Sequence, residues 1–305
     1  MIRCNNSFGR LNEIILGDVD PNVIQYCDKA EQDRLTHIFD KTQKDLNNFQ
    51  TQLEQKNVLV HRPKMIDIQE AKIPLCPRDI LFVIDNTIIE THTYQKETLF
   101  TSLYFRDIIN AQYKQGCHWY TMPTPTYESD DPIFEAASAY KYNKEIFVSN
   151  GDTWNKEGLK WVQNILPTYN FHICENKNIT GHIDTHFAII KPGLVWSGHP
   201  KDALPDYFKT WEVIEVDTST DIDLRANQSL IDTKIQDSDF EGTTLSVNVL
   251  SIDEHTICLY DHYQQNANIL RLLDKHNIEP IWVEFTFSHF FNQGLTCLTT
   301  EINRE

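Results

Sequence analysis

The sequence lacks any apolar run long enough to cross a bilayer. Its longest candidates, such as DILFVIDNTIIE, are short and interrupted by charge, whereas a membrane helix needs about 20 apolar residues. The first residues, MIRCNNSFGR, contain no apolar stretch of the kind that marks a secretory signal. We therefore expect no membrane partner.

Positive charge is also scarce. The chain has 27 Lys and Arg residues against 44 Asp and Glu residues, which gives a net charge of −17. A protein with this excess of negative charge repels phosphate backbones, so we expect no nucleic-acid partner. A negative field favours cationic small molecules, although the same charge also serves solubility alone.

Paired cysteines are missing as well. The seven cysteines include no CxxC pair, their number is odd, and their spacing is wide and irregular. This pattern argues against a zinc ribbon and against a disulfide framework. We therefore expect reduced thiols and a cytoplasmic location.

No Gly/Ser linker or low-complexity tract divides the chain, so we interpret residues 1–305 as one domain. One pattern recurs along it: an apolar strand, often a second strand, an amphipathic helix and a closing strand. The period is roughly 40 to 65 residues, which is typical of propellers, solenoids and closed arrays. Five copies are expected, over residues 11–63, 78–123, 134–174, 182–217 and 245–285.

The local signals support this α/β pattern of ββαβ repeats. Apolar residues such as Leu46, Phe49 and Leu53 follow helical spacing. Hairpin turns are expected at 85–86, 191–193 and 253–254. Helices are expected over residues 31–56, 99–114, 156–166, 205–210 and 264–276.

Five such units, each too small for a core of its own, would pack around an axis with their helices outside. The starts of several units would then converge at the centre. Asp79, Glu135, His182 and Asp184 each stand near the start of a unit. We therefore expect these four side chains around one shared pocket.

The segment GHIDTHF carries the densest set of functional side chains. If it forms a strand, His182, Asp184 and His186 point to the same face. This set has three interpretations: an acid/base histidine beside a carboxylate that binds a cation, a metal site with three ligands, or a polar strand face in solvent.

The other candidates have equally ordinary alternatives. Glu135, in FEAAS, is either a pocket carboxylate or a residue that begins a helix. Asp79, after Arg78, either holds a substrate amine or caps a loop. Cys297, in QGLTCLTTEI, is either a buried structural thiol or a nucleophile, with Gly294 allowing a tight turn and threonine hydroxyls donating hydrogen bonds to the thiolate.

Taken together, these segments resemble the amidinotransferase family of guanidino-group-modifying enzymes, of the glycine and inosamine-phosphate amidinotransferase kind. The resemblance covers most of the chain. It is carried, in order, by LNEIILG, PRDILFVIDNTIIE, GCHWYTMPTPT, FEAA, HIDTHFAIIKPG, LSVNVLSID and GLTCLT. It implies the pentein fold, a five-bladed α/β propeller with pseudo-five-fold symmetry, which agrees with the repeats.

The resemblance also implies roles. Cys297 matches the family nucleophile that forms a covalent amidino-cysteine, His182 the general acid/base and Glu135 its acidic partner, an aspartate in most of the family. Asp184 matches the carboxylate that grips the guanidinium, and Asp79 an acidic substrate-binding position. The resemblance implies a guanidino donor such as arginine, an amine acceptor, no metal or other cofactor, and a homodimer.

Several positions depart from the family pattern. The family's His-Cys pair is Thr296-Cys297 here, and Ser138 stands where the family has a second acid. Lys201 falls at or near the arginine that holds the donor's carboxylate, and a lysine offers a point charge rather than a fork. The family also has a pair of serines before the last repeat, and in this sequence other residues, around Glu241 and Gly242, stand in their place. These changes leave the donor and the acceptor open.

Three functions therefore remain at this stage. The first is an amidinotransferase that moves an amidino group from arginine or a similar donor to an amine. The second is a hydrolase of the same fold, like arginine deiminase or dimethylarginine hydrolase, in which water resolves the covalent intermediate. The third is a catalytically degenerate protein that binds a guanidino ligand.

Overall fold

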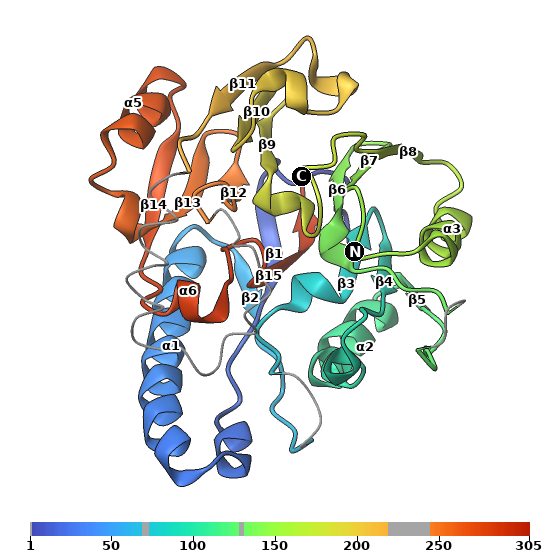
Figure 1. Ribbon diagram of the computed structural model, residues 1–305, viewed down its shortest axis with the longest axis vertical. Helices are drawn as coiled ribbons and strands as arrows, with labels where there is room; N and C mark the ends of the chain where they lie inside the picture. The colour runs from blue at the N-terminus through green and yellow to red at the C-terminus, as the bar shows by residue number, and fades with distance from the viewer. Residues whose placement is uncertain (1, 69–72, 128–130, 219–244) are drawn as a thin grey trace.

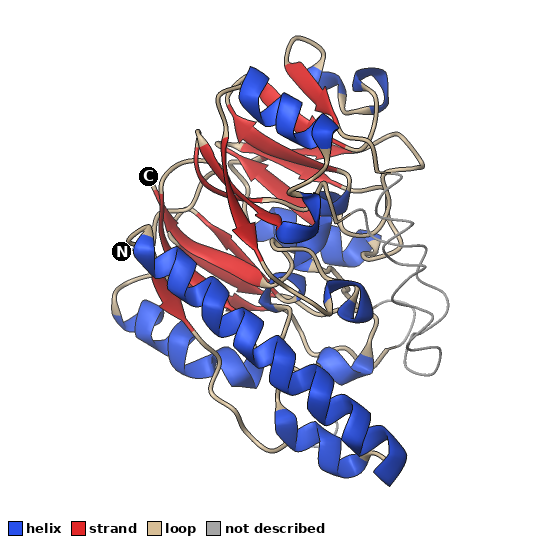
Figure 2. Ribbon diagram, turned by 90° about the vertical axis from the view of Figure 1, so that its left-hand side faces the viewer, coloured by secondary structure: helices blue, strands red, loops and turns tan. Residues whose placement is uncertain are grey.

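The structure is a computed structural model that describes residues 2–68, 73–127, 131–218 and 245–305. Within these residues the strands form five sheets of three strands each. Helices lie on the outside of the sheets, as Figure 1 and Figure 2 show. The α/β class expected from the sequence is confirmed.

The elements follow the expected order along the chain. The strands are β1 (Leu11–Leu16), β2 (Leu59–His61), β3 (Leu81–Ile84), β4 (Thr87–Glu90), β5 (His118–Thr121), β6 (Ala139–Tyr142), β7 (Glu145–Val148), β8 (Asn170–Ile173), β9 (Phe187–Lys191), β10 (Leu194–Ser197), β11 (Glu212–Glu215), β12 (Leu250–Asp253), β13 (Thr256–Tyr260), β14 (Glu279–Val283) and β15 (Thr299–Arg304). The α-helices are α1 (Lys29–Gln55), α2 (Arg106–Lys114), α3 (Lys156–Ile165), α5 (Ala267–Lys275) and α6 (Ser288–Phe291).

Four sheets are built in the same way. A tight hairpin joins the first two strands antiparallel, and the third strand returns parallel to the second. The hairpin between β3 and β4 turns at Asp85, whose φ of 46° is left-handed, and the one between β9 and β10 turns at Gly193, with φ of 85°. All three predicted hairpin turns are confirmed.

The first sheet differs, and the sequence pattern missed how. Its order is β15–β1–β2, so the last strand of the chain supplies the place that a hairpin strand takes in the other four sheets. β15 runs antiparallel to β1, with Leu16 opposite Thr299 and Leu11 opposite Arg304. The chain therefore joins its two ends within one sheet.

The helices begin and end close to the predicted residues, with two corrections. Residues 99–105 were expected to open the second helix, but Thr101–Phe105 is a 3-10 helix and α2 begins only at Arg106. The helix expected over 205–210 is a single 3-10 turn, Asp206–Phe208. These are short connections in which 3-10 geometry is common.

The longer helices pack an apolar face against the sheets. In α1, Leu46, Phe49 and Leu53 are buried, as their spacing predicted. In α3, Leu159 and Val162 join the apolar cluster of β7. No helix in the described ranges is long and apolar enough to cross a membrane.

Near the chain closure, the structure buries ionised side chains. Glu301 of β15 forms ion pairs with Lys141 of β6, at 2.8 Å between Nζ and Oε2, and with Arg304, at 3.0 Å between Nη2 and Oε1. All three are almost fully buried. Although burial alone would raise the pKa of Glu301, the two cations lower it to about 2.

We expect Glu301→Gln to lower the free energy of unfolding by about 3–5 kcal/mol at neutral pH, because two buried cations lose their counter-ion. The folded-state pKa of Glu301 lies below its ordinary value of 4.5, so its charge stabilises the fold fully above that value. That stabilisation shrinks in more acidic solution and is lost as the pH falls through about 2.

Denaturant unfolding of both proteins from neutral to acidic pH measures this difference. Glu254→Gln, at an exposed hairpin position, is the matched control and should leave stability nearly unchanged. A gap between wild type and Glu301→Gln that stays constant into strong acid would contradict the assignment.

Candidate active site

Short turns precede the first strand of several units and carry the predicted polar residues. Pro77–Asp79 leads into β3, Ala136–Ser138 into β6 and Ile183–Thr185 into β9, each as a single 3-10 turn. The second turn contacts the first and the third, an ion pair joins the first to the third, and the first also contacts β15. The expected convergence of the unit starts is therefore what the structure shows.

His182 lies at the centre of this convergence. Its Nε2 is 2.7 Å from Oε2 of Glu135, and its Nδ1 is 3.8 Å from Oδ1 of Asp79. Burial opposes a charge on the ring, but Asp79, the neighbouring Cys297 and the Glu135 carboxylate together raise its pKa well above the usual 6.5. These neighbours therefore favour the protonated imidazole.

Glu135 is not a capping residue, although it stands at the start of the turn Ala136–Ser138. Its side chain makes no cap hydrogen bond. It reaches across to His182 instead. The neighbouring Ser138 is buried and shares a hydrogen bond of 2.6 Å between its Oγ and Oγ1 of Thr153. Ser138, at the position where the family has a second acid, therefore forms a pair of hydroxyl groups with Thr153.

Cys297 lies in the turn that leads into β15. The thiol is almost fully buried, and the neighbouring Asp184, His182 and Asp79 act on its charge. Burial raises its pKa first, the Asp184 carboxylate raises it further, and His182 lowers it. The raised pKa favours the protonated thiol, and a positive charge on His182 works against it.

Asp184 is paired with a residue that sequence reasoning had not assigned. Its Oδ2 lies 3.4 Å from Nε of Arg78, and both side chains are buried. Arg78 also donates to the carbonyl oxygen of Ala139, at 2.8 Å. Among the described residues, neither carboxylate oxygen of Asp184 has a well-aligned hydrogen bond. Burial raises its pKa, while Arg78 and His182 lower it.

The expected strand at GHIDTHF is wrong. Residues Ile183–Thr185 form a 3-10 turn, and the strand β9 begins only at Phe187. His186 therefore does not join His182 on one face. Its Nδ1 is 2.8 Å from Nε2 of His199, and its Nε2 donates to the carbonyl oxygen of Thr180 at 2.6 Å.

The alternative of a metal site at this segment is not supported by the geometry. Within the described part of the chain, no group of three or more His, Cys, Asp or Glu side chains is arranged to hold a metal ion. The pKa of His186 is lowered to about 4, chiefly by burial, so its ring is neutral and accepts from His199.

The threonines around Cys297 do not serve the thiol, contrary to the prediction. Oγ1 of Thr296 donates to the carbonyl oxygen of Val249 at 2.9 Å, and Oγ1 of Thr299 donates to that of Leu295 at 3.1 Å. The donor to the sulfur is the amide of Asn248, at 3.3 Å. The run LSVNVLSID contains this asparagine, but its sequence carries no signal that it faces Cys297.

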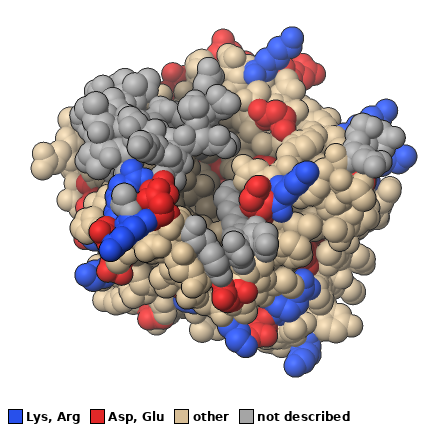
Figure 3. Space-filling model, turned by 60° about the horizontal axis from the view of Figure 1, so that its bottom comes forward, with Lys and Arg blue, Asp and Glu red and all other residues tan. Residues whose placement is uncertain are grey.

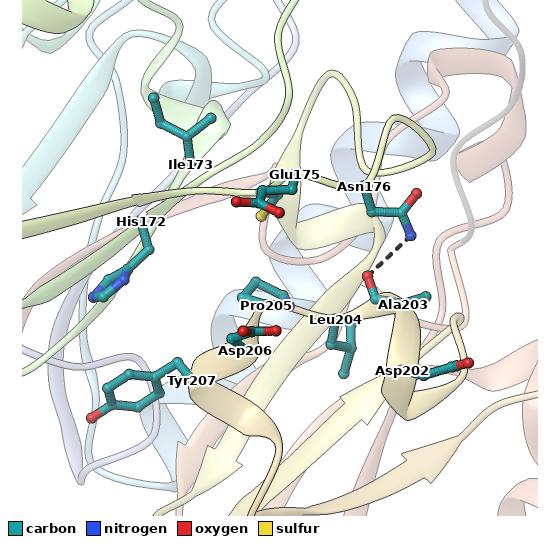
Figure 4. A pocket seen from close by; sticks show the side chains of 11 residues that line it. His172, Ile173, Glu175, Asn176, Asp202, Ala203, Leu204, Pro205, Asp206 and Tyr207 are labelled. Carbon is teal, nitrogen blue, oxygen red and sulfur yellow. Dashed lines mark hydrogen bonds between the residues drawn. The ribbon is translucent and has the colours of Figure 1, made fainter.

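Lys201 remains apart from the cluster in this structure. It opens the 3-10 turn Lys201–Ala203 and is exposed, and no described contact joins it to Cys297 or His182. Next to it, Asp202, Glu175 and Asp206 line a cavity of about 280 Å³, seen in Figure 4. This cavity shares no lining residue with the cluster. Glu241 and Gly242 lie outside the described residues.

The surface does not concentrate the net negative charge on the face shown in Figure 3. Acidic and basic side chains lie interspersed there among uncharged residues. At the cluster, by contrast, three carboxylates, those of Asp79, Glu135 and Asp184, are buried beside two cationic groups, Arg78 and His182. The site therefore places carboxylates where a bound cation could meet them.

Sequence comparison places the chain beside known enzymes, although no protein-family model matches it. Inosamine-phosphate amidinotransferase 1 of Streptomyces glaucescens is 22% identical over 350 aligned positions, which cover 100% of this chain and 97% of the relative. The mitochondrial glycine amidinotransferase of Danio rerio is 28% identical over 295 positions, which cover 83% of this chain and 67% of the relative. The resemblance to the amidinotransferases is confirmed.

Solved structures share the fold. SxtG, an amidinotransferase of Microseira wollei from saxitoxin biosynthesis, has a TM-score of 0.81 at 20% identity, over 100% of this chain and 97% of that one. A dimethylarginine dimethylaminohydrolase has a TM-score of 0.67 at 11% identity, over 95% and 99%. These likenesses show the pentein α/β fold.

The charge on His182 is open to direct test. We expect its imidazole to titrate well above pH 6.5, and the midpoint to fall in Glu135→Gln because the nearest carboxylate is lost. Since the folded pKa is raised, this charge stabilises the fold fully below pH 6.5, and the stabilisation disappears as the pH rises through the raised pKa.

Nuclear magnetic resonance of the histidine rings gives the midpoint, with His182→Asn identifying the signal. His172→Asn is the control, because His172 pairs with Glu145 away from the cluster. A ring at position 182 that titrates at or below the ordinary value would contradict the assignment.

Proposed function

We propose that this protein is an amidinotransferase in which Cys297 is the nucleophile, His182 the general acid/base and Glu135 the group that holds the imidazole. The observation that carries the proposal is that a buried thiol lies in the same buried cluster as an imidazole held by Glu135 and Asp79, with the Asp184 carboxylate beside them. A thiol, an acid and negative charge are the groups that attack on a guanidinium carbon requires. The full-length relatives named as amidinotransferases support the same reaction.

The donor in this proposal is arginine or a similar guanidino compound. A guanidinium is planar and cationic, and carboxylates bind it with paired hydrogen bonds. Asp184 offers two buried oxygens without well-aligned hydrogen bonds among the described residues, and Asp79 lies on the other side of His182. Lys201 is proposed to meet the donor's carboxylate, which would require its exposed side chain to turn toward the site.

In the first half-reaction, the approaching cation lowers the pKa of the thiol, whose proton leaves to water. The sulfur of Cys297 then attacks the guanidinium carbon and forms a C–S bond. The bond from that carbon to the donor's amine nitrogen breaks while His182 gives this nitrogen its proton. The donor leaves as an amine, and the amidino group remains on the sulfur.

In the second half-reaction, the acceptor amine attacks the same carbon. Neutral His182 takes the proton that the amine loses, and the C–S bond breaks to return the thiolate. The two steps together exchange one amine for another, and none of them draws on a metal or another cofactor. Glu135 and Asp79 stabilise the imidazolium at both ends of the cycle.

The proposal extends to the whole chain. Residues 1–305 would form one catalytic domain, with the five sheets arranged as a closed five-bladed propeller. The seven cysteines, none of them in a disulfide, suit a reducing cytoplasm. A homodimer is proposed by analogy with the family alone.

We expect incubation with arginine to add one amidino group to the protein and to release ornithine, because the covalent intermediate forms before any acceptor is needed. Intact-mass measurement detects the adduct. Cys297→Ser should carry no adduct and show no turnover, while Cys27→Ser, which removes a partly exposed thiol, should behave as wild type.

The products separate transfer from hydrolysis. Ornithine without citrulline, formed in quantity only when an amine is added, is the expected outcome. Citrulline with ammonia would identify a hydrolase on the same fold. If the Cys297→Ser variant carries no adduct and still has near wild-type activity, the covalent mechanism is refuted.

We expect His182→Asn to slow turnover by about 10²-fold or more, which is the usual scale of general acid/base catalysis. Glu135→Asp should be milder than Glu135→Gln, because the charge that holds the imidazolium matters more than the length of the side chain. Steady-state kinetics on the three variants measures this order. The histidine–glutamate pair of His172 and Glu145 provides the control, since His172→Asn should retain full activity.

A further inference from the structure

The side-chain amide of Asn248 contacts the sulfur of Cys297. Its Nδ2 donates to Sγ over 3.3 Å, and its side chain is almost fully buried. It lies just before β12, in the fifth sheet, whereas Cys297 leads into β15 of the first sheet. The contact therefore joins two sheets at the site.

The orientation of this amide is determined by its other contact. Oδ1 of Asn248 accepts a hydrogen bond from the backbone N–H of Thr296, at 2.7 Å. A backbone N–H can only donate, so the oxygen must face Thr296. The NH₂ group is then the one that faces the sulfur, as a donor. A flipped amide would set two donors against each other and leave the sulfur facing a carbonyl oxygen.

The surroundings hold the amide in place. A Cβ at Gly294 would lie 2.1 Å from Cγ and 2.3 Å from Oδ1 of Asn248, so a glycine is required by this close approach rather than by a left-handed turn. Oγ1 of Thr296 ties the same turn to the carbonyl oxygen of Val249. The donor is therefore positioned before any substrate arrives.

We propose that Asn248 is a further catalytic residue, whose amide N–H stabilises the negative charge on the sulfur of Cys297 and aims that sulfur at the amidino carbon. Hydrogen bonds from a fixed donor to a charged acceptor are stronger than those to a neutral one. The bond thus favours the thiolate both when it attacks and when it leaves. The catalytic part of this proposal rests on the proposed function, whereas the effect on the thiolate does not.

The thiolate can be followed without turnover. Its ultraviolet absorbance is titrated as the difference between each protein and the same protein carrying Cys297→Ser, so that the other six cysteines cancel. Asn248→Asp keeps the oxygen that accepts from Thr296 and replaces the donor with a second oxygen. We expect the thiolate population at a given pH to fall by about tenfold or more, the scale of a hydrogen bond to a charged group.

Asn248→Leu tests the same bond without adding charge and should shift the titration in the same direction by a smaller amount. Asn266→Asp is the matched control: Asn266 caps α5, where aspartate caps equally well, so the titration and the melting temperature should be unchanged. Melting temperatures of all variants show which of them remain folded.

Folded Asn248 variants whose thiolate titrates as in wild type would overturn the proposal, even if they were inactive. If Asn248→Asp does not fold, the Asn248→Leu titration decides in the same way. A shifted titration in a protein that forms no amidino adduct with arginine would uphold the role of Asn248 toward the thiolate and refute the proposed function.

Discussion

The pairing of β15 with β1 is the interaction on which the site depends. It continues beyond the strands, because the backbone N–H of Gly17 donates to the carbonyl oxygen of Leu298 at 2.8 Å. The residue before Leu298 is Cys297. The first strand of the chain therefore anchors the turn that holds the thiol. Segments from the two ends of the sequence thus lie side by side at the candidate active site. Without this pairing, Cys297 would have no defined distance to His182.

Around that closure, the protein buries several charged side chains. The ions fall into two groups. Lys141, Glu301 and Arg304 pair with one another and depress the pKa of the glutamate, which is the behaviour of a satisfied structural network. Near His182 the arrangement is different, since Asp79, Glu135 and Asp184 lie around one imidazole and one guanidinium. Clusters of buried titratable groups of this kind are typical of functional sites.

The placement of these groups follows a general division of labour. The sheets and helices are regular, and the polar residues lie on the one-turn segments that precede the central strands. Because a rigid scaffold positions each short turn, side chains from three units reach one point. The same arrangement explains why His182 and Asp184, two residues apart, have different partners. In a strand their side chains would point to the same face, whereas in this 3-10 turn His182 reaches Glu135 and Asp184 reaches Arg78.

Sequence periodicity alone determined the repeats, the hairpins at Asp85 and Gly193, and the buried face of α1, because all of these depend on contacts between near neighbours. The place of Asp79, Glu135, His182 and Asp184 at the starts of units predicted their convergence. The resemblance to amidinotransferases gave them roles and added Cys297, and it also added Lys201, which lies apart from the cluster. Tertiary structure decided the rest. The pairing of β15 with β1, the ion pair of Arg78 with Asp184 and the hydrogen bond of Asn248 to Cys297 join residues far apart along the chain. No local pattern encodes such contacts, since they exist only once the separate units have packed against one another.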